Sequence, residues 1–236
     1  MRLIDLSQEI YQGMSMFPMH QRTFIMTNMS YEENMELTGS KTLGFSARNL
    51  LLSEHCGTHT DGISEFDPEG PTVDAMPLTH FWGTAICLDL SFVPPSRYIE
   101  PEDLQRALDR SGQEIRKGDI VLLYTGHHEA RSGTDEYQTV YTGLSFEGGC
   151  WLGERGVVNI GVDAPAIDNA MDLLPETAHP EFAGHMACAK YGMTNTENLC
   201  NLDQLVGKRF LYFGLPLKIR GGSGSPIRAV ALVDER

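Results

Sequence analysis

Two histidines and an aspartate lie close together in the segment HCGTHTD, which covers residues 55–61. Imidazole nitrogens and a carboxylate oxygen form a ligand set that suits zinc, manganese or iron. In an extended chain His55, His59 and Asp61 would point to one side because both offsets are even, and a turn at Gly57 would let them converge. The same spacing also occurs in histidines that are hydrogen-bonded within a loop, so spacing alone leaves a metal site and a structural role open.

A second pair of candidate ligands lies further along the chain. His185 falls in a predicted helix over residues 180–191, and Glu197 follows twelve positions after it. The helix is predicted to end at Gly192, which would let the chain fold back and aim both side chains at one point. Taken alone, these two residues are better explained as a core histidine and a solvated glutamate.

The elements that must position these residues alternate in type. Apolar runs predict strands over residues 3–6, 45–52, 85–90, 120–124, 157–162, 210–215 and 228–233. Further helices are predicted over residues 101–110, with Pro101 in the first turn, and over residues 145–155, with Ser145 as the cap. This order predicts an α/β fold in which helices pack on a mixed sheet, within a single domain spanning residues 1–236.

Charge and composition exclude several classes of protein. The 236 residues include 18 Lys and Arg against 32 Asp and Glu, a formal net charge of −14. Nucleic-acid binding depends on clustered basic residues, so we expect no nucleic-acid partner. No uncharged apolar run approaches the roughly 18 residues of a membrane helix, and the first residues carry acids where a signal peptide is apolar. We therefore expect a cytoplasmic protein without a membrane partner. The five cysteines form no C-x-x-C pair, which predicts buried thiols and not a disulfide framework.

The sequence resembles one family over nearly its whole length. Residues 55–61 are similar to the H-x-G-T-H-x-D signature of the cyclase-like metal-dependent hydrolases, which include bacterial kynurenine formamidases, isatin hydrolases and small imidases. The central block of that family is similar to residues 142–168, and its second ligand block to residues 185–205. Its C-terminal stretch is similar to GSPIRA at residues 224–229.

The resemblance implies a swivelling β/β/α fold and a site for divalent metal. His55, His59 and Asp61 would hold one ion, and Asp61 would bridge to a second ion held by His185 and Glu197. One or two ions per subunit, zinc or manganese, would activate water for attack on a substrate. Family members are commonly dimers or tetramers with sites near subunit contacts, so a homo-oligomer is expected.

Two positions depart from the family pattern. Glu65 stands four residues after Asp61, where the family usually has a histidine that acts as general acid and base. We expect Glu65 to carry the proton. In the alternative, Glu65 would instead contact a metal-binding histidine and orient its ring. Phe17, which precedes Pro18, replaces a pocket-lining tryptophan of the formamidases. Both changes favour a relative that acts on another amide, such as a cyclic one.

Three further features are candidates for substrate contact. His127 and His128 follow the predicted strand over residues 120–124, and neighbouring side chains of an extended chain point apart. At most one of them, with His127 as the candidate, is therefore expected at the site. Ser225 in the C-terminal stretch is a second candidate. The five methionines between residues 14 and 29 would form an adaptable lid or, more readily, a core or subunit contact.

The sequence thus predicts a metal-dependent hydrolase that cleaves a non-peptide amide C–N bond of a small molecule, preferably in a cyclic imide or lactam. Hydrolysis of N-formylkynurenine, the arylformamidase reaction, is the alternative. A third possibility, outside the enzymes, is a non-catalytic binding protein whose metal ion only stabilises the fold. Structural zinc sites are usually rich in cysteine, whereas the ligands expected here include none. A serine hydrolase is not favoured, because the sequence has no G-x-S-x-G motif between a predicted strand and a predicted helix.

Overall fold

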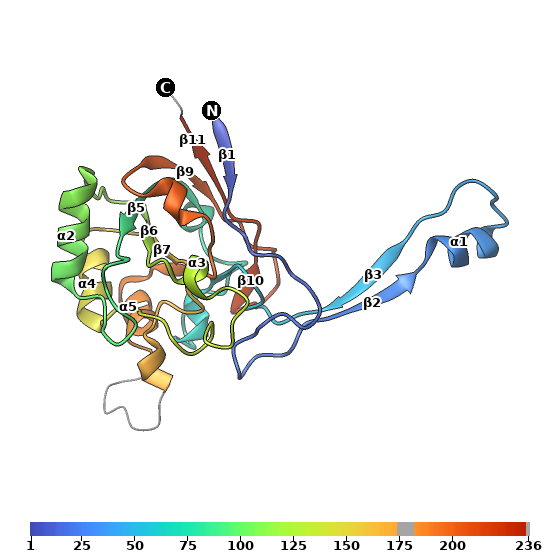
Figure 1. Cartoon of the computed structure of the whole chain (residues 1–236), viewed down its shortest axis with the longest axis horizontal. Coiled ribbons are helices and arrows are strands. Elements are labelled where there is room, and N and C mark those ends of the chain that lie inside the picture. Colours follow the sequence, from blue (N-terminus) through green and yellow to red (C-terminus); the bar gives the residue numbers. More distant parts are fainter. Residues whose placement is uncertain (174–181, 235–236) are drawn as a thin grey trace.

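The central feature of the fold is a nine-stranded sheet (Figure 1), seen in a computed structural model that describes residues 1–173 and 182–234. Its spatial order is β1 (Arg2–Asp5), β11 (Val230–Val233), β9 (Arg209–Phe213), β5 (Trp82–Asp89), β6 (Ile120–Tyr124), β7 (Asn159–Val162), β8 (Thr194–Glu197), β4 (His59–Asp61) and β10 (Gly224–Pro226). The four strands from β5 to β8 are parallel to one another. The remaining neighbours are antiparallel. The predicted α/β class with a mixed sheet is confirmed.

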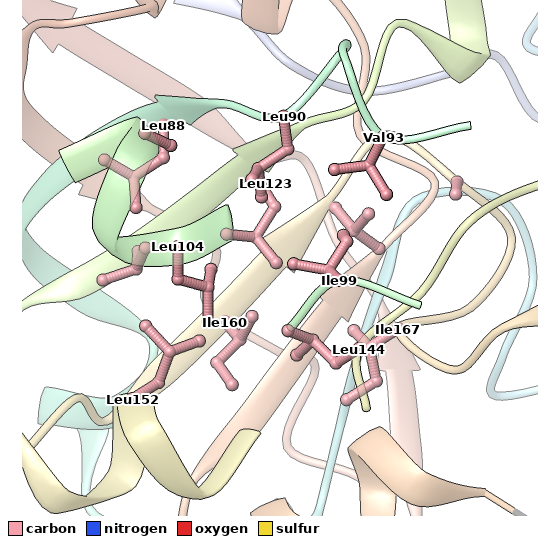
Figure 2. Close-up of a cluster of buried hydrophobic side chains, with 14 of the residues drawn as sticks. Leu88, Leu90, Val93, Ile99, Leu104, Leu123, Leu144, Leu152, Ile160 and Ile167 are labelled. Atoms are coloured by element: carbon pink, nitrogen blue, oxygen red, sulfur yellow. The ribbon is translucent and has the colours of Figure 1, made fainter. Parts of the chain in front are cut away.

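Helices cover one face of the parallel strands and leave a second core on the other face. The covering helices are α2 (Pro101–Ser111), α4 (Phe146–Glu154) and α5 (Ala183–Tyr191). In β6, Val121 and Leu123 belong to the core beneath the helices, whereas Ile120 and Leu122 belong to the opposite core. Figure 2 shows the first core, where Leu104 of α2 and Leu152 of α4 lie near Ile160 of β7. Because alternate side chains enter opposite cores, β6 consists only of apolar residues and a tyrosine.

The ends of the helices follow the predicted capping residues. Ser145 caps α4, since its hydroxyl accepts a hydrogen bond from the backbone N–H of Gly148 at 3.0 Å. Pro101 occupies the first turn of α2, and Gly112 beyond its end has a φ of 64°. α5 begins at Ala183 and ends before Gly192. Residues 180 and 181 of the predicted helix lie outside the described residues.

A ribbon projects from the body of the molecule, and we call residues 22–51 the arm. It consists of β2 (Phe24–Met29), α1 (Tyr31–Thr38) and β3 (Ala47–Leu51), and β2 and β3 form a separate two-stranded sheet. Figure 1 shows it extending away from the main sheet. The strand predicted over residues 45–52 is therefore present, shortened to Ala47–Leu51, but it lies outside the main sheet and is largely exposed.

The chain after β6 differs from the sequence prediction. Residues 127–131 form a short helix, α3 (His127–Arg131), where an extended segment was expected. Gly126 has a φ of 74°, and the Asp163 carboxylate accepts hydrogen bonds from the backbone N–H groups of Thr125, Gly126 and His127. The cap that makes the helix possible comes from Asp163, which directly follows β7 (Asn159–Val162) and which the local sequence around residue 127 does not reveal.

Two expectations from composition can be compared with the structure. All five cysteines are free and buried, as predicted. Over the described ranges, none of the helices combines the length and apolar character that a membrane crossing requires.

Candidate metal and active site

Pairing of two short strands brings the distant candidate ligands together. β4 and β8 are antiparallel neighbours, with His59 opposite Glu197. His59 Nε2 lies 3.5 Å from Glu197 Oε2 and 3.4 Å from Asp61 Oδ1. His59 and Asp61 are two residues apart on one strand, so they share a face of the sheet.

His55 reaches the same point from the turn before β4. Its Nδ1 lies 2.7 Å from Asp61 Oδ1, and Gly57, with a φ of 61°, provides the turn that sequence spacing suggested. Gly224 of β10 lies directly against the ring, because a Cβ there would stand 2.6 Å from His55 Cε1. Only glycine therefore fits at residue 224 without moving the histidine.

His185 enters the cluster from the first turn of α5, nearer the start of the helix than the mid-helix position expected from sequence. Its Nε2 lies 3.3 Å from Glu197 Oε1 and 3.7 Å from Asp61 Oδ2. Its Nδ1 faces Asp168 Oδ2 at 2.5 Å. Asp168 Oδ1 also accepts hydrogen bonds from the backbone N–H groups of Gly184 and His185, so one carboxylate fixes both the helix end and the ring.

Glu65 lies beside both groups of ligands. It ends the short 3₁₀ helix η1 (Ile63–Glu65), and its Oε1 is 3.6 Å from His55 Nδ1. Its Oε2 is buried 3.8 Å from His185 Nε2 and has no hydrogen-bond partner in the part of the chain that the structure describes. Burial, together with the nearby charge of Asp61, raises the pKa of Glu65 to about 8. The side chain can therefore hold a proton near neutral pH.

The charges of the cluster favour a cation. Burial lowers the pKa of His59, but Asp61 and Glu197 outweigh it and raise that pKa to about 9. Burial also disfavours ionised Asp61, but His59 and His55 hold its pKa well below the usual value. The negative charge of these carboxylates stabilises the protonated, positively charged form of the buried His59. The same negative charge would stabilise a bound metal ion.

The donor atoms fit divalent metal. Ligand atoms of His55, His59 and Asp61 lie within 4.8 Å of one another, and so do those of Asp61, Glu65 and His185. Asp61 is common to both groups, as expected for a bridging ligand.

The ring nitrogens that face away from the cluster are also engaged, as is usual for metal-binding histidines. His59 Nδ1 contacts the carbonyl oxygen of Gly57 at 2.8 Å. His55 Nε2 contacts Ser223 Oγ at 3.2 Å, and that hydroxyl donates to Glu54 Oε2.

Comparison with known proteins gives matches over the same residues. The family model described as "Putative cyclase" matches residues 4–169, which include the histidines of β4 and its preceding turn. The chain belongs to the cyclase family. The family expected from the sequence motifs is thereby confirmed.

Two relatives and one solved structure show how far the similarity extends. The kynurenine formamidase of Salinibacter ruber is 31% identical over 230 residues, which cover 98% of this chain and 97% of that protein. The kynurenine formamidase of Bordetella petrii is 28% identical, with 97% of each chain covered. Isatin hydrolase A from Labrenzia aggregata, solved with benzyl benzoate, superposes with a TM-score of 0.84 at 25% identity, covering 99% of this chain and 94% of that one.

A cavity of about 300 Å³ opens onto the ligand cluster of this cyclase-family chain. It is lined by His55, His59, Glu65, His185 and Glu197. Its apolar wall includes the predicted Phe17 and three of the methionines of the N-terminal stretch, Met14, Met16 and Met19. The structure therefore gathers Glu65, Phe17 and four of the five predicted ligands around one space, while the fifth, Asp61, is buried and contacts His55, His59 and His185.

Two predicted substrate contacts lie elsewhere. His127 is buried, its Nε2 contacts the carbonyl oxygen of Tyr137 at 2.9 Å, and it does not line this cavity. Burial lowers its pKa to about 4. Ser225 is fully buried, and its hydroxyl accepts from the backbone N–H of Leu217 and donates to the carbonyl oxygen of Pro226. Both side chains are engaged by backbone groups outside the cavity, so neither is placed to contact a substrate there.

Sequence reasoning did not assign a role to two residues that support the cluster. Asp168 orients His185, as described above. Asn195 lies on β8 two residues before Glu197, and its amide donates to Asp61 Oδ2 and to Glu197 Oε1. An offset of two on a strand was the available signal for Asn195. No local signal marked Asp168, because its partner lies seventeen residues away.

Proposed function

We propose that the chain is a metal-dependent hydrolase that cleaves a non-peptide amide C–N bond, with cyclic imides and lactams as preferred substrates. The observation that carries this proposal is the cluster of His and carboxylate ligands at the base of a small, largely apolar cavity. The relatives named as kynurenine formamidases and isatin hydrolases support amide hydrolysis.

The ligands divide into two groups that share Asp61. His55, His59 and Asp61 would hold one ion. Asp61 and His185 would hold a second together with Glu197, whose Oε1 lies 3.3 Å from His185 Nε2. Zinc or manganese suits these nitrogen and oxygen donors. A divalent cation held there would polarise the substrate carbonyl and make a nearby water more acidic.

Glu65 is the proton carrier in this proposal. A cation held at the cluster would favour the ionised form of Glu65. As water adds to the carbonyl carbon, this carboxylate accepts the proton, and it then gives that proton to the nitrogen as the C–N bond breaks. Its Oε2 has no partner within the described chain, so this oxygen is free to receive the proton. The contact of 3.8 Å with His185 Nε2 places that oxygen at the ligand cluster.

Aromatic residues shield the reacting groups. Phe66 stacks on the His185 ring, with centroids 4.2 Å apart, and packs against Phe182 at 5.0 Å. Phe17 lies on the cavity wall. Exclusion of water by such walls strengthens the electrostatic interactions within the site.

The lining of the cavity favours neutral substrates. No Lys or Arg is among the described residues that line it, whereas Glu65, Asp168 and Glu197 are. N-formylkynurenine carries an amino-acid carboxylate that would find no Lys or Arg side chain among the described lining residues. A neutral cyclic imide or lactam has no such unpaired charge to desolvate. The arylformamidase reaction is the second candidate, supported by the names of the similar proteins.

A comparison of substrates tests the proposal. The metal-reconstituted protein would be assayed with a succinimide-type ring, a hydantoin, isatin, a lactone and N-formylkynurenine. We expect the highest kcat/KM among the cyclic amides. A highest value with N-formylkynurenine would favour the arylformamidase, and no turnover of any amide would exclude both reactions.

We also propose that the arm contacts a second copy of this chain. A two-stranded ribbon is marginally stable in water, yet Phe24, Leu50 and Leu51 of the arm are 42%, 60% and 51% exposed. Contact with a partner would cover these side chains.

The charges of the arm favour a second copy as that partner. It contains three basic residues and three acidic ones, so it is neutral within a chain of net charge −14; these residues are Arg22, Lys41, Arg48, Glu32, Glu33 and Glu36. Two acidic molecules can therefore approach through their arms with the least repulsion. Outside the arm, the chain also exposes Trp82, Leu215 and Leu217. Each copy therefore carries two exposed apolar surfaces, one on the arm and one on the body, and a contact between two copies can bring them together.

A further inference from the structure

Besides Oε2 of Glu65, two polar atoms of residues that line the cavity have no hydrogen-bond partner among the described residues. They are the hydroxyl oxygen of Tyr141 and Oε1 of Gln138, and both atoms are buried. Both residues line the cavity that contains the ligand cluster. Nearly all buried polar groups of native proteins are paired, so these two atoms point to a ligand that pairs with them.

Tyr141 differs in this respect from the other buried tyrosines of the described chain. Tyr137 donates to Asn198 Oδ1 at 3.0 Å, and Tyr212 donates to Thr196 Oγ1 at 3.3 Å. Tyr141 is 1% exposed, and its hydroxyl has no hydrogen-bond partner among residues 1–173 and 182–234. The phenol therefore occupies a buried position without the local hydrogen bond that normally stabilises one.

The hydroxyl of Tyr141 is a donor. Burial, followed by the charges of Glu197, Asp168 and Asp172, raises its pKa above the usual value. Glu197 is a candidate ligand and Asp168 orients another, so two of these three charges belong to the ligand cluster and its supporting residues. A phenol that keeps its proton can donate one hydrogen bond to a carbonyl oxygen.

We propose that Tyr141 and Gln138 bind the unreacted half of a cyclic imide. Tyr141 Oη donates to the second carbonyl oxygen of the ring, and Gln138 Oε1 accepts from the ring N–H, while the first carbonyl lies at the ligand cluster. This inference rests on the proposed hydrolase function and specifies its substrate class. A lactam offers the N–H but lacks the second carbonyl, so Tyr141 distinguishes the two kinds of ring.

Binding of two matched rings tests the assignment. Glutarimide and δ-valerolactam have the same ring size and differ in the second carbonyl. Their dissociation constants would be measured on the metal-loaded protein by calorimetry, or by competition in an activity assay. A neutral hydrogen bond of average strength corresponds to roughly a tenfold difference. We therefore expect the wild-type protein to bind glutarimide about tenfold more tightly.

Two variants should change this ratio in different ways. Tyr141→Phe should abolish the preference for glutarimide, so that the two dissociation constants become about equal, and it should leave the affinity for δ-valerolactam unchanged. Gln138→Leu should weaken both rings alike, because both contain an N–H group. Tyr212→Phe is the matched control, since it removes a buried hydroxyl whose partner is Thr196, and it should retain the wild-type ratio.

The outcomes separate this inference from the proposed function. A tenfold preference that persists in Tyr141→Phe, or a wild-type protein without any preference, would overturn the assignment. Thermal unfolding of each variant shows whether it is folded under the assay conditions. If the wild-type protein shows the preference but hydrolyses no amide, the hydrolase proposal fails while the binding assignment stands.

Discussion

Replacement of Asp168 by asparagine should prevent His185 from binding metal, although Asp168 is not itself a candidate ligand. Asp168 Oδ1 accepts from the backbone N–H groups of Gly184 and His185, and Oδ2 faces His185 Nδ1. In Asp168→Asn, the remaining oxygen can stay with the two backbone donors. The new NH₂ group then faces Nδ1, which must act as an acceptor. The ring proton consequently moves to Nε2, the nitrogen that faces the ligand cluster.

The size of the effect follows from this change of tautomer. A protonated Nε2 cannot bind a cation, and loss of such outer hydrogen bonds typically lowers metal affinity 10- to 100-fold. This corresponds to about 1.4–2.8 kcal/mol of binding free energy. The same substitution weakens charge-assisted hydrogen bonds at the start of α5, so we expect the metal-free protein to lose about 1–3 kcal/mol of unfolding free energy.

Metal titration at fixed pH measures the first quantity, and chemical unfolding of the metal-free protein measures the second. Asp163→Asn is the matched control. Asp163 is also fully buried and accepts backbone hydrogen bonds at the start of a helix, but it lies outside the cavity. It should lose similar stability while binding metal as the wild type does. Unchanged metal affinity in Asp168→Asn would refute the tautomer argument.

Four further outcomes are expected. Glu65→Gln should retain the metal content of the wild-type protein and lose 10²- to 10⁴-fold in kcat, and wild-type turnover would exclude Glu65 as proton carrier. His59→Ala should lower the metal content measured by elemental analysis, and a full complement of metal would contradict its assignment as a ligand. A chelator should abolish activity with little change in melting temperature, whereas unfolding on chelation would support an ion that only staples the fold. The double variant Leu50→Glu, Leu51→Glu should sediment as a monomer while Leu3→Glu, another exposed leucine, sediments as the wild type; a monomeric wild-type protein would rule out the arm contact.

Several elements could be predicted because their determinants are local. The strand over residues 120–124 was found at the predicted bounds, since both of its faces are buried and every position is therefore apolar or aromatic. The start of α4 followed from Ser145, whose hydroxyl bonds to a backbone N–H three residues ahead. Capping and continuous burial act within a few residues, so the sequence expresses them directly.

Other elements could not be predicted because their stabilising partners are distant in sequence. β8 has the sequence TNTE and is fully buried, without the apolar alternation that identifies a strand. Its polar side chains are satisfied by neighbours such as Asp61, which Asn195 contacts. The place of β3 in a separate two-stranded ribbon could not be predicted for a similar reason, because strand type is encoded locally but the choice of partner strand is not.

The sequence by itself indicated the kind of chemistry, since the residue types of the cluster, together with the resemblance to the cyclase-like hydrolases, implied a His and carboxylate ligand set. Only the tertiary structure decided the geometry. The pairing of β4 with β8 places His59 opposite Glu197, and the contact of Asp168 with α5 sets the face that His185 presents. These relations depend on packing between segments that are far apart in the chain. For the same reason His127 and Ser225 lie outside the cavity, whereas Tyr141 and Gln138 line it.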